Sequence, residues 1–164
     1  MYLLLYVLYS SLSMAKKVMN IQTLTELEVF SKKIKTLLIK KTIKGATVVV
    51  LTGDLGAGKT TFVQNLGREF GISEIMPSPT FGIMKSYPLT HQHFTTLVHM
   101  DAYRIEEIAE LGPLCFLELL AEKGVLLVVE WGERIVSALP SERLELCIES
   151  EESGLRTIRV NNYL

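Results

Sequence analysis

The stretch Gly53-Asp-Leu-Gly-Ala-Gly-Lys-Thr60 constrains this chain more than any other, because it fits the pattern G-x-x-x-x-G-K-[ST]. The segment before it, Thr47–Thr52, is β-branched and apolar, which predicts a buried parallel strand. After it, apolar residues recur at helical spacing up to Phe70, and Gly71 is typical of a position just beyond a helix end. A strand, a glycine loop and a helix N-terminus in this order predict a phosphate-binding site.

In such a loop, backbone N–H groups converge on the phosphate oxygens, and the positive end of the helix dipole favours the anion. We expect the Lys59 ammonium to reach the terminal phosphates and the Thr60 hydroxyl to ligate Mg²⁺. The segment therefore predicts binding of a nucleoside triphosphate. Its candidate nucleotide-binding residues are Gly53, Asp54, Leu55, Gly56, Ala57, Gly58, Lys59, Thr60 and Thr61.

Length and composition indicate one globular domain, over 21–164, because the chain has 164 residues, of which 48% are hydrophobic and 21% charged. The formal net charge of −1 argues against an extended surface for nucleic acid. Lysines cluster over 32–44 and glutamates over 106–122. Such runs are usually solvated helix faces, and a local basic contact with RNA or a partner stays open as an alternative. The two cysteines lack metal-type spacing, which fits a reducing cytosol.

Residues 1–20 are interpreted as a leader separate from this domain. The apolar run at its start is too short to cross a bilayer, and it lacks the basic start and the small-residue cleavage site of a signal peptide. We expect Met14 or Met19 to be the true start, with the leader an artefact of start-codon choice. No membrane association is predicted, and a cytoplasmic location is expected.

Ahead of the glycine loop, an apolar stripe predicts a helix over 24–38. Thr23 and Thr25 are both candidate N-caps, because each is followed three residues later by a glutamate. Beyond the loop's helix, strands over 83–87 and 97–100 flank a polar loop, which predicts a hairpin at a sheet edge.

Two short helices, over 105–111 and 113–123 with a break at Gly112, are expected next. The wholly apolar segment 125–129 is typical of a central parallel strand. Alternating residues on both sides of the turn 151–154 predict a C-terminal antiparallel hairpin. The order of elements predicts an α/β, P-loop NTPase-like fold in three layers, with a central mostly parallel sheet, antiparallel edge strands and helices on both faces.

A phosphate loop needs an acidic partner at the end of a neighbouring strand to hold hydrated Mg²⁺. Asp101 and Glu130 each close an apolar strand segment and are the two candidates. An acid at the carboxyl end of a parallel strand lies at the ligand edge of the sheet. The competing interpretation for either residue is a cap on the following helix.

The segment Pro77-Ser-Pro-Thr-Phe81 is extended or turning, because its two prolines exclude a regular helix. It is placed to lie over the γ-phosphate, with Thr80 near Mg²⁺ or the attacking water; a rigid proline turn is the alternative. His99 is a candidate to orient Asp101, or else a core residue whose hydrogen bonds are satisfied.

Three further segments each have two interpretations. Arg104 could bring a cation toward the phosphates or pair with Glu106 or Glu107. Trp131, the only tryptophan, could stack on a base, on ribose or on a partner, or pack in the core. The pair His91-x-His93 has no acidic or cysteine companion nearby, so a solvated loop is predicted there rather than a metal site.

Four motifs occur in a fixed order: Gly53–Phe62, Ser78-Pro-Thr-Phe81, His99-Met-Asp-Ala-Tyr-Arg104 and Glu130-Trp131. In this combination the chain resembles the bacterial TsaE (YjeE) family, small P-loop ATPases needed for the threonylcarbamoyladenosine modification of tRNA. The resemblance runs from about Thr23 to the C-terminal hairpin.

The resemblance implies a Mg²⁺-dependent ATPase that hydrolyses ATP in complex with the proteins TsaB and TsaD. Hydrolysis would support repeated threonylcarbamoyl transfer by TsaD, with tRNA contacted indirectly or weakly. By the matching motifs, Thr60 and Glu130 would ligate Mg²⁺, while Asp101 would act in hydrolysis, with Lys59 and Thr80, or would assist the metal. Trp131 and Glu133 would lie near the nucleotide. The leader, the Lys40–Lys44 segment and the Pro88–Thr96 loop depart from the family, so no adenine-contacting residue is assigned around Thr23–Thr25.

Two other functions remain open. One is a small P-loop metabolite kinase, disfavoured because no arginine-rich lid follows the loop. The other is a nucleotide-gated binding switch with little turnover, for which GTP is disfavoured because no N-K-x-D segment is present.

Overall fold

The computed structural model describes residues 17–41 and 44–162, and within them seven strands form one sheet. The strands are β1 (Lys17–Ile21), β2 (Thr47–Thr52), β3 (Met84–Pro88), β4 (Thr96–Asp101), β5 (Val125–Glu130), β6 (Leu144–Ser150) and β7 (Arg156–Asn162). The α-helices are α1 (Leu24–Leu38), α2 (Lys59–Glu69) and α3 (Phe116–Ala121), and the 3₁₀ helices are η1 (Ile108–Leu114) and η2 (Gly132–Ala138).

The sheet order is β1-β7-β6-β2-β5-β4-β3. Its four central strands, β6, β2, β5 and β4, run parallel to their neighbours in that group. The outer pairs β1–β7, β7–β6 and β4–β3 are antiparallel. The predicted α/β fold, with a parallel centre and antiparallel edges, is therefore confirmed.

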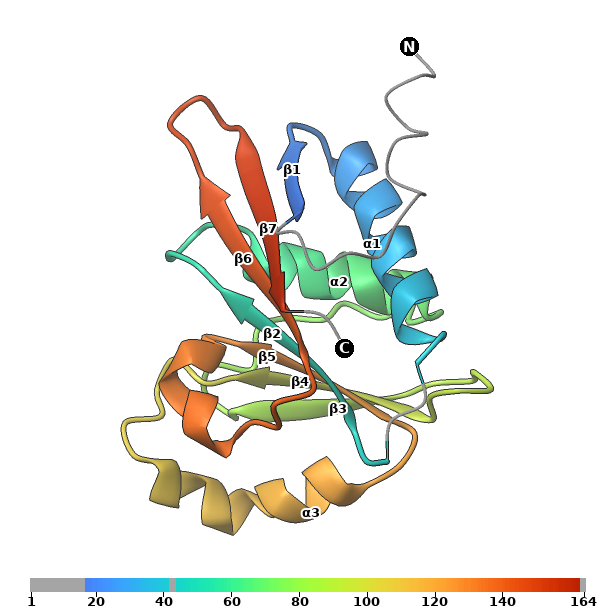
Figure 1. Cartoon of the computed structure of the whole chain (residues 1–164), viewed down its shortest axis with the longest axis vertical. Coiled ribbons are helices and arrows are strands. Elements are labelled where there is room, and N and C mark those ends of the chain that lie inside the picture. Colours follow the sequence, from blue (N-terminus) through green and yellow to red (C-terminus); the bar gives the residue numbers. More distant parts are fainter. Residues whose placement is uncertain (1–16, 42–43, 163–164) are drawn as a thin grey trace.

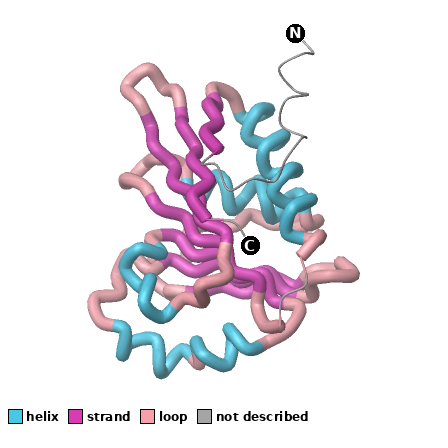
Figure 2. Tube along the Cα trace, in the orientation of Figure 1, coloured by secondary structure: helices cyan, strands magenta, loops and turns pink. Residues whose placement is uncertain are grey.

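Two apolar cores cover the two faces of this sheet, and alternation along β2 separates them. Val49 and Leu51 point into the core beneath α1 and α2, whereas Val48 and Val50 point into the core beneath η1, α3 and η2. Figures 1 and 2 show the long helices on one face and the short ones on the other. Strand β5 is buried along its whole length, as its apolar run predicts.

The helix predicted over 24–38 forms with those bounds, and its N-cap is Thr23 rather than Thr25. The Thr23 hydroxyl accepts a hydrogen bond from the Glu26 N–H at 3.2 Å, and the Glu26 carboxylate accepts one from the Thr23 N–H at 3.0 Å. This capping box fixes the direction in which the chain leaves β1. Phe30 of α1 packs against Phe62 of α2, with ring centroids 5.9 Å apart.

Three local features differ from the sequence predictions. Strand β1 falls partly within the segment interpreted as a leader, while 1–16 lies outside the described residues. The break between the two short helices lies at Cys115, with φ of 50°, and not at Gly112, which is inside η1. A 3₁₀ helix, η2, follows β5 where no element was predicted. Among the described residues, no helix is both long and apolar enough to traverse a bilayer.

Candidate functional site

The glycine loop joins the carboxyl end of β2 to the first turn of α2, as its pattern predicts. Gly53 has a φ of 129°, and a Cβ there would lie 1.9 Å from the Ile148 carbonyl oxygen of β6. Only glycine fits this position, because any side chain would collide with the backbone of the neighbouring strand. The loop is therefore held directly against the sheet.

In front of the loop lies a hollow of about 350 Å³ at the carboxyl ends of β2, β4 and β5. It brings together residues from all four sequence motifs: Leu55, Gly56, Gly58, Lys59, Thr60, Thr61, Ser78, Thr80, Asp101, Tyr103, Glu130 and Trp131. Four other candidates do not line it. Gly53, Asp54 and Ala57 belong to the loop behind it, and Glu133 lies exposed on η2.

The side chain of Lys59 lies inside the loop, and only 4% of the residue is exposed. Its Nζ donates hydrogen bonds to the carbonyl oxygens of Gly53 at 2.6 Å and Asp54 at 2.8 Å. The same Nζ is 3.7 Å from the ring centroid of Trp131. Burial is the largest effect on the Lys59 ammonium and holds its pKa below the ordinary value for lysine. The nearby negative charges of Glu130, Glu133, Asp101 and Asp54 act in the opposite direction and offset part of this shift. The ammonium thus contacts loop carbonyl oxygens and an aromatic ring.

Glu130 ends β5 beside the first turn of α2. Its Oε2 accepts a hydrogen bond from the Thr60 hydroxyl at 3.0 Å, and its Oε1 lies 2.8 Å from Nε2 of His99. Both Glu130 and His99 are buried. His99 thus contacts Glu130 and not Asp101, so of its two interpretations the orientation of Asp101 is wrong. The other, a core residue, is right for its burial, but only Nε2 is satisfied, because Nδ1 has no hydrogen-bond partner among the described residues.

Asp101 is the register partner of Glu130 on the neighbouring strand β4. Its Oδ2 accepts hydrogen bonds from the hydroxyls of Ser78 at 2.6 Å and Thr80 at 2.7 Å. Its Oδ1 accepts one from the Tyr103 backbone N–H at 3.0 Å. The acid therefore ties the Ser78–Phe81 loop to the sheet edge.

The aromatic and cationic residues around the hollow contact one another, and packing of Trp131 against the core was one of its two predicted interpretations. The guanidinium of Arg104 lies 4.4 Å from the ring centroid of Phe81, and neither Glu106 nor Glu107 pairs with it among the described residues. Phe81 itself is 88% exposed. The rings of Tyr103 and Trp131 pack at 5.1 Å, which places Trp131 at the side of the hollow and partly in the core.

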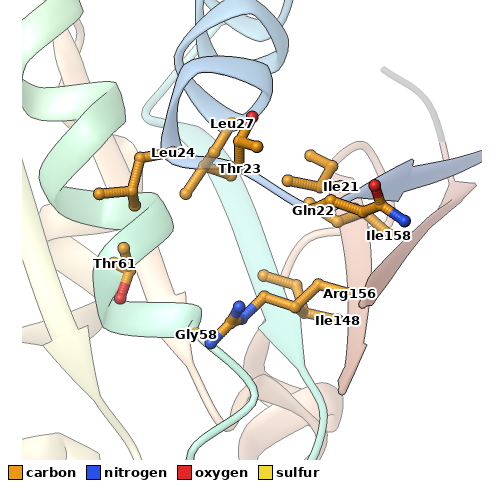
Figure 3. A pocket seen from close by; sticks show the side chains of 10 residues that line it. All are labelled: Ile21, Gln22, Thr23, Leu24, Leu27, Gly58, Thr61, Ile148, Arg156 and Ile158. Carbon is orange, nitrogen blue, oxygen red and sulfur yellow. The ribbon is translucent and has the colours of Figure 1, made fainter. Parts of the chain in front are cut away.

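A second pocket, of about 200 Å³, lies on the other side of the glycine loop and was not predicted from the sequence. Figure 3 shows Gly58 and Thr61 at one wall and the segment from β1 to α1 at the other. Its lining is mainly apolar: Ile21, Gln22, Thr23, Leu24, Leu27, Gly58, Thr61, Ile148, Arg156 and Ile158. In the sequence, Leu24, Leu27, Ile148 and Ile158 are recognisable only as apolar positions of a helix or strand. An apolar residue that lines a pocket has the same spacing as one that packs in the core, so the pocket could not be predicted.

The histidine pair of the Pro88–Thr96 loop is used in packing. The His91 ring meets Phe70 edge-on at 5.4 Å, and its Nδ1 accepts a hydrogen bond from the His93 N–H at 3.2 Å. Within the described ranges, no group of three or more His, Cys, Asp or Glu side chains is arranged to hold a metal ion. Magnesium beside a phosphate loop does not need one, because substrate phosphates and water complete its coordination.

Comparison with known proteins shows which family the chain resembles. The family model described as threonylcarbamoyl adenosine biosynthesis protein TsaE matches residues 21–158. The chain is 43% identical over 115 residues to the tRNA threonylcarbamoyladenosine biosynthesis protein TsaE of Bacillus subtilis (strain 168), covering 70% of this chain and 69% of that protein. It is 37% identical over 122 residues to the protein of the same name from Treponema pallidum (strain Nichols), covering 74% and 87%.

A solved structure is also similar. The crystal structure of Bacillus subtilis YdiB superposes with a TM-score of 0.64 at 29% sequence identity, covering 92% of this chain and 87% of that one.

Proposed function

Because the chain belongs to the TsaE family, with its role in tRNA threonylcarbamoyladenosine biosynthesis, we propose that it is a Mg²⁺-dependent ATPase of that pathway. It hydrolyses ATP slowly alone and faster in complex with TsaB and TsaD, and this hydrolysis supports repeated threonylcarbamoyl transfer. It works in the cytoplasm and contacts tRNA indirectly or weakly.

The observation that carries the proposal is the meeting of Thr60 and Glu130 at the first turn of α2, with their oxygens 3.0 Å apart. A hydroxyl and a carboxylate oxygen at this spacing, beside a loop of the phosphate-binding type, suit the hard oxygen preference of Mg²⁺. Bound there, the ion would neutralise charge on the phosphates of ATP. Thr60 and Glu130 are the residues that would hold it.

Other groups of the chain bind the phosphates and activate the attacking water. The loop N–H groups and the α2 N-terminus bind the phosphates, and the Lys59 ammonium stabilises negative charge on the terminal ones. Asp101 orients the attacking water and accepts its proton, since it lies in the same hollow as Lys59 and Thr60. Thr80, bonded to Asp101, holds that carboxylate in place.

The pocket behind Gly58 and Thr61 takes the nucleoside. It adjoins the loop on the side of α2, and its apolar walls from β1, α1 and β6 can enclose a flat base. The segment 21–27, which carries none of the four motifs, would contact the base from the side of the pocket opposite the loop.

The Ser78–Phe81 loop is the means by which partners respond to the nucleotide. Two of its hydroxyls are bonded to Asp101, and its Phe81 side chain lies almost fully in solvent. A change at the γ-phosphate can therefore move an exposed aromatic side chain that a partner is able to contact.

The test is phosphate release from ATP by the purified protein, with and without a TsaB–TsaD complex and with and without Mg²⁺. We expect weak release alone, a marked rise with the partners, and none in excess EDTA. A Lys59→Ala variant mixed with the same partners controls for contaminating ATPases. If TsaB and TsaD do not raise the rate, the proposed role in their complex is wrong; transfer of the phosphate to a metabolite instead of water would indicate the kinase alternative.

A further inference from the structure

One arginine far from the sequence motifs contacts the phosphate loop. Arg156 is the first residue of β7, and its backbone is fixed on both sides, because it pairs with Ile21 of β1 and Ser150 of β6. Its side chain is partly buried and points toward Gly58 of the loop (Figure 3). The contact joins positions 99 residues apart.

The contact is specific to one peptide group of the loop. Arg156 Nε donates a hydrogen bond to the Ala57 carbonyl oxygen at 3.2 Å. The Ala57–Gly58 peptide is trans, and a trans peptide points its C=O and N–H groups in opposite directions. Holding the Ala57 carbonyl therefore fixes the direction of the Gly58 N–H, in a loop whose N–H groups are expected to bind phosphate.

The residue at position 58 permits this approach. A Cβ on Gly58 would lie 3.2 Å from Arg156 Nε, which is tighter than most real Cβ contacts, and 3.5 Å from its Cδ, an ordinary contact distance. The positive φ of Gly58, 106°, is also unfavourable for other residues. The glycine thus allows both the turn into α2 and the close passage of the arginine side chain.

The charge of Arg156 is directed to the site and not to an internal carboxylate. Arg143 and Arg159 form ion pairs with Glu145 and Glu149. For Arg156, by contrast, no carboxylate lies within ion-pair distance among the residues that the structure describes, and its remaining contact is a long one of 3.5 Å from Nη1 to the Gly154 carbonyl. Its guanidinium lines the pocket that we assign to the nucleoside.

We propose that Arg156 is a positioning residue of the nucleotide site. It holds the Ala57–Gly58 peptide in the orientation that binds phosphate, and it supplies a positive charge between the phosphate loop and the nucleoside pocket. This inference rests on the proposed binding of ATP. It makes the C-terminal hairpin, which carries none of the four motifs, part of the nucleotide site.

The test compares Arg156→Ala with Arg159→Ala, the same change three positions along β7 at an arginine that pairs with Glu149. Binding of a fluorescent ADP derivative with Mg²⁺ is measured for both. Loss of a hydrogen bond from a charged group predicts at least about tenfold weaker binding by Arg156→Ala, and binding by Arg159→Ala within about twofold of the parent. In ATP hydrolysis, KM should rise about tenfold while kcat stays within about twofold.

Two further variants separate positioning from folding. Arg156→Lys retains the charge and one donor, so we expect it to recover most of the lost affinity. Arg156→Gln retains a donor without the charge and is measured alongside, so that the comparison survives if the alanine variant does not fold; it should bind ADP several-fold more weakly than the parent. Melting temperatures without nucleotide are recorded for every variant.

The outcomes are distinct. If the parent protein does not bind ADP, the proposed function fails first. If the parent binds ADP but Arg156→Ala or Arg156→Gln binds it equally well, only the inference about Arg156 is overturned. Equal weakening by Arg159→Ala would also overturn it, because the effect would then come from the hairpin as a whole.

Discussion

Asp101 and Glu130 are register partners at the carboxyl ends of β4 and β5, yet they are held by regions of different character. Glu130 is held by the buried His99 and by Thr60 of α2, and we call these three residues the core-anchored half. Asp101 is held by Ser78 and Thr80 of an exposed loop, and we call these three the loop-anchored half. Both acids are almost fully buried themselves.

The difference lies in what each acid is fixed to. The three residues of the core-anchored half lie on β5, β4 and α2, elements that cannot shift without disturbing the two apolar cores. In the loop-anchored half, Asp101 ends β4, whereas Ser78 and Thr80 lie between α2 and β3, outside any helix or strand. A fixed carboxylate suits metal binding, and a carboxylate coupled to a loop suits a step that must respond to a partner.

The largest expected effect is in the core-anchored half. Glu130→Gln retains the shape of the side chain but removes the charge beside Thr60, and we expect about a thousandfold loss of ATP hydrolysis, with a higher Mg²⁺ requirement. The measurement is phosphate release across a Mg²⁺ titration. Glu118→Gln makes the same chemical change on an exposed face of α3 as the control. If Glu130→Gln hydrolyses ATP as well as the parent does, the metal role belongs to Asp101.

Asp101→Asn tests the loop-anchored half. The amide cannot accept a proton, so we expect about a hundredfold lower kcat, while binding of Mg²⁺–ADP stays within about threefold of the parent. Single-turnover hydrolysis and ADP titration separate the two quantities. A large loss of Mg²⁺–ADP binding would remove the distinction between the two halves.

His99→Leu tests whether the contact with His99 Nε2 holds the Glu130 carboxylate in position. The variant removes the partner of Oε1 from a buried carboxylate, and outer-shell changes of this kind typically lower metal affinity by about tenfold or more. We expect a corresponding rise in the Mg²⁺ concentration that gives half-maximal hydrolysis. His99→Gln, whose amide can donate in place of the ring, should recover part of the loss. An unchanged Mg²⁺ requirement in His99→Leu would show that Thr60 alone positions Glu130.

The smallest expected effect is on stability, at Glu26, an exposed carboxylate that serves as a reference for the two buried ones. Hydrogen bonds from the backbone N–H groups of Gln22 and Thr23 lower the pKa of Glu26 below its ordinary value of 4.5. A lowered folded-state pKa contributes stability above the unfolded value, and this stability is lost as pH falls through the folded-state pKa. Glu26→Gln should therefore melt slightly below the parent at pH 7, with the difference vanishing in acid. A difference that persists below that pKa would point to lost packing.

Local sequence signals predicted much of this site, because its residues lie at element ends that follow hydrophobic runs. The strand before the glycine loop, the buried strand ending in Glu130 and the capping box at Thr23 all formed as expected. Each of these three features depends on residues that lie only a few positions apart in the sequence. The metal and catalytic roles of Glu130 and Asp101 remain predictions.

Features that depend on distant partners were not predicted. The contact of His99 with Glu130 requires that β4 and β5 be adjacent in register, and the contact of Arg156 with Ala57 requires the order β7-β6-β2. Hydrophobic periodicity specifies neither. The helix break was misplaced for a different reason: glycine is the usual residue at positive φ, whereas here Cys115 adopts that conformation.

The order of strands also has a consequence for how the protein is made. Strand β1 pairs with β7, and Thr157 donates a hydrogen bond to Asn20, 137 residues earlier in the chain. During synthesis, the glycine loop leaves the ribosome long before β6 and β7, the strands that lie against Gly53 and Ala57. A nascent chain stalled before the last hairpin thus carries the whole glycine loop without the strands β6 and β7 that contact it. We expect such a chain to acquire nucleotide affinity only when its final strands have been translated.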